Sequence, residues 1–185
     1  MKVLVAASSA KELSSFPLSY RRVVTGVGPV LAAAMTAKAI SEEKPDAVFS
    51  VGSAGSMGEL SVGACISFGS VIFPDLDLTL YGFERGETLL PEGKRIGKIQ
   101  LDKNSSRVLM TSSAFSSSPV DFADAADMEA YGVALASSLY SVPCFACKVI
   151  TDVVGVHITL KEYGLQLRSL LSKLPEKVEE VLHSF

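Results

Sequence analysis

Two carboxylic acids stand at points of the chain where a short apolar run gives way to polar residues. Glu12 closes the polar stretch after the first apolar run, and Asp152 follows the run 145–150 with one hydroxyl residue, Thr151, between them. A carboxylic acid can give a proton to a leaving group and a carboxylate can take one from water, so such a pair suits general acid–base chemistry. Each residue also has a structural interpretation: Glu12 as a solvated glutamate near a helix dipole, and Asp152 as a helix cap.

A third carboxylate and an aromatic side chain are candidates for binding. Glu129 follows Asp127-Met128, where a helix is expected to begin, and it could accept hydrogen bonds from a vicinal diol such as ribose. Negative charge is favoured in a first helical turn in any case, so capping is the competing interpretation. Phe115 stands alone among serines after another strand, where it could stack on a planar ring or pack in the core.

Two glycine-containing stretches, 25–28 and 52–55, follow apolar strands and are similar to loops that cradle a phosphate. Neither completes the GxxxxGK(S/T) pattern, nor the GxGxxG pattern with an acidic residue about twenty positions further on. Backbone N–H groups at such turns suit a sugar or a bound water equally well. The two stretches therefore do not by themselves predict a nucleotide site.

The spacing Cys144-x-x-Cys147 suggests a metal or redox site, but the pair lies in an apolar strand rather than at a helix start. Residues three apart on a strand point to opposite faces of the sheet. A zinc site would need about two further ligands, and only Cys65, His157 and His183 remain. We therefore expect both thiols to pack in the core and no metal to be bound.

Short apolar runs alternate with helical patterns along the chain. Strands are expected at 3–7, 22–25, 47–51, 65–73, 107–111 and 143–150, and helices at 30–43, 127–139 and 159–185, the last interrupted by Pro175. This alternation predicts an α/β sandwich with helices on both faces of the sheet. Ligands of such sheets bind beyond the carboxyl ends of the strands, so chemistry is expected in the segments that follow them.

Length and composition exclude several classes of protein. With 185 residues, 48% of them hydrophobic and 20% charged, the chain is expected to form one domain, 1–185, with a substantial core. Its 17 basic and 20 acidic residues leave a net charge of −3, too mild for a nucleic-acid binder. Three cysteines are too few for a secreted disulfide framework, and no apolar stretch reaches the roughly 18–20 residues of a membrane span. A cytoplasmic protein with no export or membrane segment is expected.

Short pieces in a fixed order, from residue 2 to about 174, together carry a family resemblance. They are Lys11-Glu12-Leu13, Thr25-Gly26-Val27-Gly28, Lys44-Pro45-Asp46, Val51-Gly52-Ser53-Ala54-Gly55, Val62-Gly63, 77–83, Ser113-Ala114-Phe115, Asp127-Met128-Glu129-Ala130, Val142-Pro143 and 149–153. In this order they resemble the nucleoside phosphorylase and nucleosidase superfamily, above all 5′-methylthioadenosine/S-adenosylhomocysteine nucleosidases and the futalosine hydrolases of menaquinone biosynthesis. The resemblance implies a three-layer α/β/α sandwich around a central mixed, largely parallel twisted sheet.

The resemblance also implies a hydrolase that cleaves the N-glycosidic bond of a purine nucleoside without metal or organic cofactor. Asp152, aided by Thr151, matches the acid that protonates N7 of the purine, and Glu12 matches the base that orients the attacking water. This division of labour is chemically sound, because a protonated purine leaves more readily from a sugar that becomes oxocarbenium-like. The substrate contacts that it implies are ribose at Met128 and Glu129, purine stacking at Phe115, base-edge hydrogen bonds from the Ser116 backbone, and the sugar and nucleophile near Ser53.

The residues that would bind a phosphate ion distinguish a phosphorylase from a hydrolase. Phosphorylases of the superfamily resemble one another in having an arginine just before the Gly-(Ser/Thr) loop, whereas this chain has Ser50 at that position. In addition, the negative charge of Glu12 would repel phosphate. Water is therefore the expected nucleophile, although Arg21 and Arg22 are cations that could still serve a phosphate. A phosphate-dependent phosphorylase and a non-catalytic nucleoside-binding protein stay open as alternatives.

The chain departs from the family pattern in two places. Lys148 stands where an arginine is common, and the region 91–107 is shorter than in typical methylthioadenosine nucleosidases, which could reshape the pocket for the 5′ substituent. The sequence does not distinguish which 5′ substituent the substrate carries: a methylthio, a homocysteinyl or a futalosine-type group. The resemblance further implies a homodimer in which the loop that carries Tyr81, Leu90 and Pro91 lies near the neighbouring active site.

Overall fold

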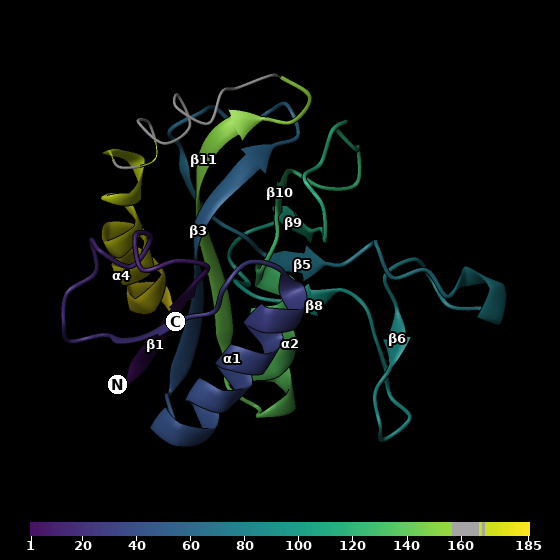
Figure 1. Ribbon diagram of the computed structural model, residues 1–185, viewed down its shortest axis with the longest axis horizontal. Helices are drawn as coiled ribbons and strands as arrows, with labels where there is room; N and C mark the ends of the chain where they lie inside the picture. The colour runs from purple at the N-terminus through teal and green to yellow at the C-terminus, as the bar shows by residue number, and fades with distance from the viewer. Residues whose placement is uncertain (157–166, 168) are drawn as a thin grey trace.

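The computed structural model describes residues 1–156, 167 and 169–185 (Figure 1). Its centre is a nine-stranded sheet in the order β2-β1-β3-β10-β9-β5-β8, with β11 paired to β3 and β4. The strands are β1(Val3–Ala7), β2(Arg21–Val24), β3(Ala47–Ser56), β4(Cys65–Ser67), β5(Ser70–Ile72), β8(Ile99–Gln100), β9(Val108–Thr111), β10(Ala125–Asp127) and β11(Cys144–Val153). Most neighbours run parallel, and β10 with β3, β11 with β4 and β5 with β8 run antiparallel.

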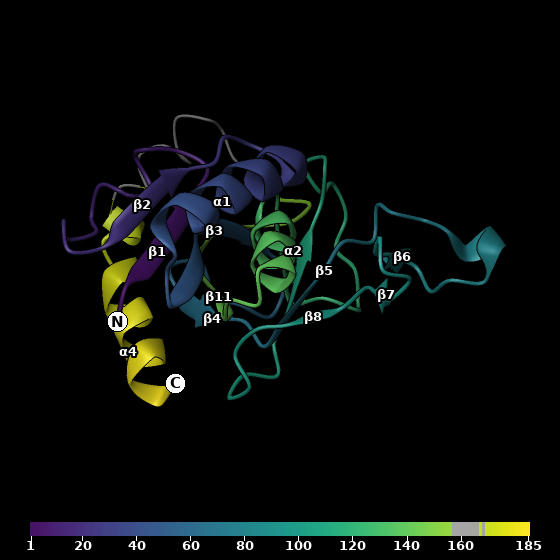
Figure 2. The same ribbon diagram turned by 90° about the horizontal axis from the view of Figure 1, so that it is seen from below.

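Helices flank this sheet on both faces. Figures 1 and 2 show α1(Pro29–Glu43) and α2(Ala130–Leu139) side by side on one face and α4(Leu174–Ser184) on the other. Side chains alternate along β1: Val3, Val5 and Ala7 pack in the cluster that includes α4, whereas Leu4 and Ala6 pack with α1. The predicted fold class, a mixed and mostly parallel sheet between helices, is confirmed. Among the described residues, no helix is both long and apolar enough to cross a bilayer.

Residues 73–98 leave the sheet between β5 and β8 and form an arm that projects from the body (Figure 2). The arm carries the short 3-10 helix η1(Thr79–Tyr81) and a small antiparallel pair, β6(Thr88–Leu89) and β7(Arg95–Ile96). Leu80 is 97% exposed and Tyr81 78% exposed. The arm therefore presents apolar side chains to solvent.

Two predicted strand boundaries are wrong because long-range pairing extends the strands. The predicted strand 47–51 continues as β3 to Ser56, and the predicted strand 143–150 continues as β11 to Val153, since the two pair along their whole length. A third boundary is wrong because the predicted strand 65–73 is divided at Gly69. A Cβ there would lie 1.9 Å from the carbonyl oxygen of Ser105, so only glycine fits.

Two predicted helices also differ. The helix predicted at 127–139 begins at Ala130, because the residues before it form β10. Of the helix predicted at 159–185, residues 159–166 and 168 lie outside the described residues. The predicted interruption near Pro175 is confirmed: a turn at 172–173 separates helical residues 169–171 from α4, and Pro175 lies in the first turn of α4, where proline is well accommodated.

Strand β3 positions the polar segments of the molecule. One of its edges pairs with β11, and the other pairs first with β1, over 47–50, and then with β10, at Gly55 and Ser56. Because β1 runs parallel to β3 and β10 runs antiparallel, the carboxyl ends of β1 and β10 face each other along this edge. The polar segments that follow both strands converge on residues 51–54 between the two pairings.

Candidate active site

A cleft lies where these segments converge on the middle of β3. The cleft has a volume of about 200 Å³ and is open to solvent on one side. All of the site residues predicted from sequence line it: Glu12, Ser53, Phe115, Ser116, Met128, Glu129, Thr151 and Asp152. The fold thus brings the candidate residues together, and the role of each stays a prediction.

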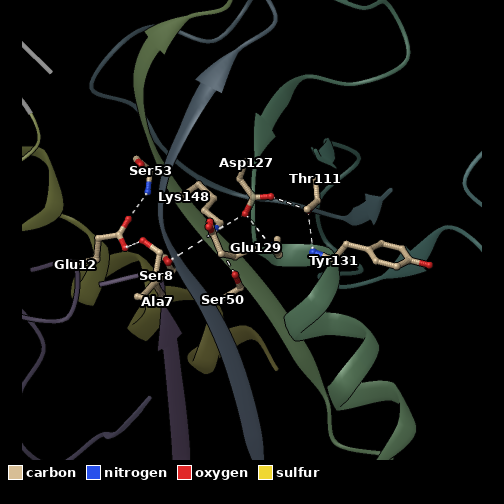
Figure 3. Close-up of polar contacts among 12 residues, drawn as sticks. Ala7, Ser8, Glu12, Ser50, Ser53, Thr111, Asp127, Glu129, Tyr131 and Lys148 are labelled. Carbon is tan, nitrogen blue, oxygen red and sulfur yellow. Dashed lines mark hydrogen bonds and ion pairs between the residues drawn. The ribbon is translucent and has the colours of Figure 1, made fainter. Parts of the chain in front are cut away.

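Glu12 is buried, with 6% of its surface exposed, so the alternative of a solvated glutamate is wrong. A turn closed by the Glu12 N–H and the Ser9 carbonyl (3.2 Å) follows the end of β1. Glu12 Oε2 accepts hydrogen bonds from the Ser8 hydroxyl (2.5 Å), the Ser9 N–H (3.1 Å) and the Ser9 hydroxyl (3.3 Å). Glu12 Oε1 accepts one from the Ser53 N–H at 3.4 Å (Figure 3). These donors compensate the cost of burying a carboxylate.

Two glycines of β3 make room for the two candidate catalytic carboxyls. A Cβ at Gly52 would lie 2.6 Å from Glu12 Oε1, and a Cβ at Gly55 would lie 3.0 Å from Asp152 Oδ2. Gly52 also has a φ of +140°, a conformation that favours glycine. These glycines allow a close approach, as a glycine-rich stretch predicts, but the groups that approach are the carboxyls of the protein itself.

Asp152 lies inside β11 opposite Gly55, so the alternative of a helix cap is wrong. Its Oδ1 accepts a hydrogen bond from the Thr151 hydroxyl at 2.7 Å. Adjacent residues of a regular strand point to opposite faces, yet Thr151 and Asp152 both line the cleft. The register of β11 against β3 shifts between Ile150 and Asp152, and such an irregularity re-aims a side chain.

Glu129 occupies the N-cap position of α2, but its side chain makes no capping hydrogen bond, so the interpretation of the carboxylate as a cap is wrong. Its Oε1 accepts a hydrogen bond from the Gly28 N–H (3.0 Å), whereas Asp127 Oδ2 accepts from the Ala130 N–H (2.9 Å) at the start of α2. The glycine stretch after β2 therefore serves the Glu129 carboxylate. Burial raises the pKa of Glu129, and the Lys148 ammonium opposes that rise without cancelling it.

This raised pKa predicts that Glu129→Gln stabilises the protein at neutral pH. A carboxyl whose pKa is raised on folding costs stability once ionised, so stability falls as pH rises from the ordinary value of 4.5 through the folded value. Glutamine keeps an acceptor for the Gly28 N–H and carries no charge. We expect a Tm higher by about 2 °C at about pH 7 and unchanged at about pH 4, measured by circular dichroism. Exposed Glu42→Gln is the matched control, and a lower Tm for Glu129→Gln at neutral pH would contradict the prediction.

A buried ion pair lies next to these carboxylates, as Figure 3 shows. Lys148 Nζ and Asp127 Oδ2 are 2.9 Å apart, and their side chains are 2% and 1% exposed. Lys148 Nζ also donates to the Ser50 hydroxyl (3.1 Å), and Asp127 Oδ1 accepts from the Thr111 hydroxyl (2.7 Å). The Thr111 oxygen in turn accepts from the Tyr131 N–H (2.9 Å). The network joins β3, β9, β10, β11 and α2.

Sequence reasoning missed this pair. It noted Lys148 as a replacement for arginine and treated Asp127 as part of a helix start. The available signal was a lone lysine inside the apolar run 145–150, because a lysine is fully buried only when it is paired. Burial lowers the pKa of Lys148, but Asp127 and Glu129 outweigh this effect, and the pKa is raised above its ordinary value.

The remaining predicted substrate contacts are Phe115, Ser116 and Met128. Phe115 is 80% exposed, so the alternative of core packing is wrong and the ring is free to meet a ligand. Ser116 and Met128 are partly buried, and both line the cleft. These residues come from the segments that follow β9 and β10, as expected for an α/β sheet.

The candidate cations for an anion site lie elsewhere. Arg21 and Arg22 are on β2 and exposed, and Arg21 Nε pairs with Glu43 at 3.3 Å. Ser50 is buried and accepts its hydrogen bond from Lys148. Among the described residues that line the cleft, none is an arginine or a lysine.

The two cysteines of the Cys144-x-x-Cys147 stretch point to opposite faces, as predicted. Cys147 packs in the cluster on the α4 side, and Cys144 packs against the two clusters on the other side. Burial raises the pKa of Cys144 to about 12 and raises that of Cys147 further. Within the described ranges, no group of three His, Cys, Asp or Glu side chains could hold a metal ion.

Comparisons with known proteins agree with this fold, although no family model matches the chain. The 5′-methylthioadenosine/S-adenosylhomocysteine nucleosidase of Helicobacter pylori, solved with a pyrrolopyrimidine ligand, superposes with a TM-score of 0.82 at 16% identity over 100% of this chain and 99% of its own. The futalosine hydrolase of Helicobacter pylori superposes with a TM-score of 0.81 at 16% identity over 100% and 98%. This chain therefore shares the fold of these solved nucleosidase and hydrolase structures.

Sequence matches extend the comparison. The 5′-methylthioadenosine/S-adenosylhomocysteine nucleosidase of a Geobacillus species is 29% identical over 157 residues, which cover 71% of this chain and 66% of the relative. That of Chromohalobacter salexigens is 26% identical over 175 residues, which cover 80% and 71%. The first of these matches thus spans just under two thirds of the relative's length. The predicted resemblance is confirmed: the chain is similar in sequence and in fold to 5′-methylthioadenosine/S-adenosylhomocysteine nucleosidases.

Proposed function

We propose that this protein hydrolyses the N-glycosidic bond of a 5′-modified purine nucleoside and releases the purine base. The observation that carries the proposal is that the Glu12, Glu129 and Asp152 carboxyls line one cleft. Similarity to nucleosidases in sequence and fold supports the same reaction class. We propose a single domain over 1–185 and no metal or organic cofactor.

In the proposed mechanism, Asp152 gives a proton to N7 of the purine, so that the base leaves neutral from an oxocarbenium-like sugar. The Thr151 hydroxyl donates a hydrogen bond to Asp152 Oδ1, so Asp152 Oδ2 is the oxygen that carries and transfers the proton. Glu12 takes a proton from a water that attacks the anomeric carbon. Glu129 holds the ribose hydroxyls beside Met128, Phe115 stacks on the purine, and the backbone at Ser116 bonds its edge, which together fix the reacting carbon.

We infer that water is the nucleophile because the cleft favours it over phosphate. The Glu12 carboxylate accepts the hydrogen bonds that an anion would need near residues 8, 9 and 53, and its charge opposes a phosphate. Phosphate would also require cationic partners, and the described residues that line the cleft include no lysine or arginine.

The proposal is tested by incubating the protein with methylthioadenosine, S-adenosylhomocysteine, aminodeoxyfutalosine and futalosine, in phosphate-free buffer and with added phosphate, and measuring the free base by chromatography. Base release without phosphate from at least one substrate is expected, and the rates identify the 5′ substituent. Strict phosphate dependence with a sugar 1-phosphate as product would instead make the protein a phosphorylase. Ligand binding without cleavage at any enzyme concentration would make it a non-catalytic nucleoside-binding protein.

We also propose a homodimer in which the loop with Tyr81, Leu90 and Pro91 lies near the neighbouring active site. The projecting arm and its exposed side chains at Leu80 and Tyr81 support a second copy as the partner, because exposed apolar groups on an extended arm are usually covered. Sedimentation equilibrium of the wild type and of Leu80→Asp measures the association; a monomer at micromolar concentration would refute it.

A further inference from the structure

The Glu12 carboxylate is held asymmetrically. Oε2 accepts three hydrogen bonds, from the Ser8 hydroxyl, the Ser9 N–H and the Ser9 hydroxyl. Oε1 accepts one among the described residues, a long one of 3.4 Å from the Ser53 N–H. A carboxylate oxygen has two lone pairs, so Oε2 is fully used by its donors, whereas Oε1 keeps acceptor capacity.

Oε1 is also the oxygen that lies against Gly52. A Cβ at Gly52 would lie 2.6 Å from Oε1, so Oε1 packs directly against the backbone of β3 at this glycine. The carboxylate therefore has one oxygen tied to the turn after β1 and the other lying over β3, on the side of Ser53, which lines the cleft.

We propose that Ser8 and Ser9 are positioning residues that fix the carboxylate of Glu12 through Oε2 and so reserve Oε1 as the atom that receives the proton of the attacking water. The inference rests on the proposed hydrolysis and deepens it. In the balanced step, the O–H bond of water breaks toward Oε1, the water oxygen bonds to the anomeric carbon, and the glycosidic electron pair leaves with the purine, which holds the proton from Asp152.

The physical reason is that a general base acts only when its basic atom is aimed at the proton in the transition state. Without the two hydroxyls, the carboxylate of Glu12 can rotate about its last bond and would exchange its oxygens. Hydrogen bonds to a charged group contribute more free energy than those between neutral groups. Their loss is expected to lower kcat rather than to raise KM, because the carboxylate acts in the reaction step and not in substrate binding.

The test compares Ser8→Ala, Ser9→Ala and the double variant with the wild type, using a nucleoside that the wild type cleaves. We expect kcat to fall about 10-fold for Ser8→Ala and about 100-fold for the double variant, with KM within about 2-fold. Ser8→Thr keeps the hydroxyl and is expected to restore most of kcat. Ser14→Ala is the matched control, because Ser14 lies in the same segment, is exposed, and donates its hydroxyl hydrogen bond to the Lys11 carbonyl.

A second measurement does not depend on the intact glutamate. Glu12→Ala leaves the serine donors facing a vacated carboxylate position, and formate is expected to restore part of the hydrolysis. In Ser8→Ala/Glu12→Ala the formate concentration for half-maximal rescue is expected to rise about 10-fold. This measurement decides the matter if the double serine variant fails to fold.

The outcomes separate the inference from the proposed function. Wild-type kcat in Ser8→Ala/Ser9→Ala, or equal rescue by formate with and without Ser8, would overturn the positioning role and leave hydrolysis standing. A rise of KM with unchanged kcat would also overturn it, because the serines would then serve substrate binding. If the wild type cleaves no nucleoside, the proposed function and this inference fall together.

Discussion

Asp152→Asn is expected to lower the rate of purine release by about 10²–10⁴-fold, the usual contribution of a general acid. Asparagine has the shape of the aspartic acid and can still accept the hydrogen bond from the Thr151 hydroxyl, so the cleft should stay intact. It has no acidic proton to give to N7, and the purine must then leave as an anion. The measurement is single-turnover base release, which isolates cleavage from product release.

A change of leaving group makes this experiment specific to proton donation. Nitrophenolate leaves readily without protonation, so Asp152→Asn is expected to cleave a 4-nitrophenyl riboside at close to the wild-type rate, while Glu12→Ala loses both activities. Asp121→Asn is the control, because Asp121 is exposed and does not line the cleft. Wild-type purine release by Asp152→Asn would remove Asp152 from the mechanism, and equal loss on both substrates would point to damage of the site.

The location of the site could be predicted from local pattern and one general rule. The apolar run Val3–Ala7 and the Ala-rich stretch before Lys44-Pro45 have unambiguous periodicity, and the structure has β1 and α1 there. Ligands of α/β sheets bind beyond the carboxyl ends of strands, and the structure brings the segments after β1, β10 and β11 to one cleft. The sequence alone therefore identifies the residues that follow each strand, and the general rule places those residues at the site.

Distances and partners could not be predicted, because they depend on pairing between distant parts of the chain. Residues 52–56 read as a glycine loop, and they form a strand because β11, about a hundred residues further on, pairs with them. Residues 127–129 read as a helix start, and pairing with β9 makes Asp127 the end of a strand instead. Local propensity is a weak prior wherever such tertiary pairing competes with it.

The glycines illustrate a feature that sequence reasoning identifies and explains wrongly. The pattern predicts that Gly52 and Gly55 admit the backbone to a ligand, and both do allow a close approach. The approaching groups are Glu12 and Asp152, which lie on other segments of the fold. Nothing in the local sequence states which side chain fills a space that a glycine leaves open.

Lys148→Met is expected to lower the free energy of unfolding by about 3–5 kcal/mol, because it leaves Asp127 charged and unpaired in the interior. Methionine fills the volume of the lysine stem, so the loss is electrostatic rather than a cavity effect. The raised pKa of Lys148 means that its contribution is fully present below the ordinary value of 10.5 and is lost only as pH rises through the folded value. Urea unfolding at neutral pH measures the effect.

A double-mutant cycle shows whether the loss belongs to the pair. Asp127→Asn removes the opposite charge but keeps an acceptor for the Ala130 N–H, so Lys148→Met/Asp127→Asn leaves neither charge buried alone. We expect the double variant to be more stable than the sum of the single losses by about 2–3 kcal/mol. Lys38→Met breaks an exposed ion pair with Glu42 and is expected to change stability by less than about 0.5 kcal/mol. Additive losses in the cycle would contradict the prediction, because Lys148 and Asp127 would then stabilise the fold through separate contacts rather than through their mutual attraction.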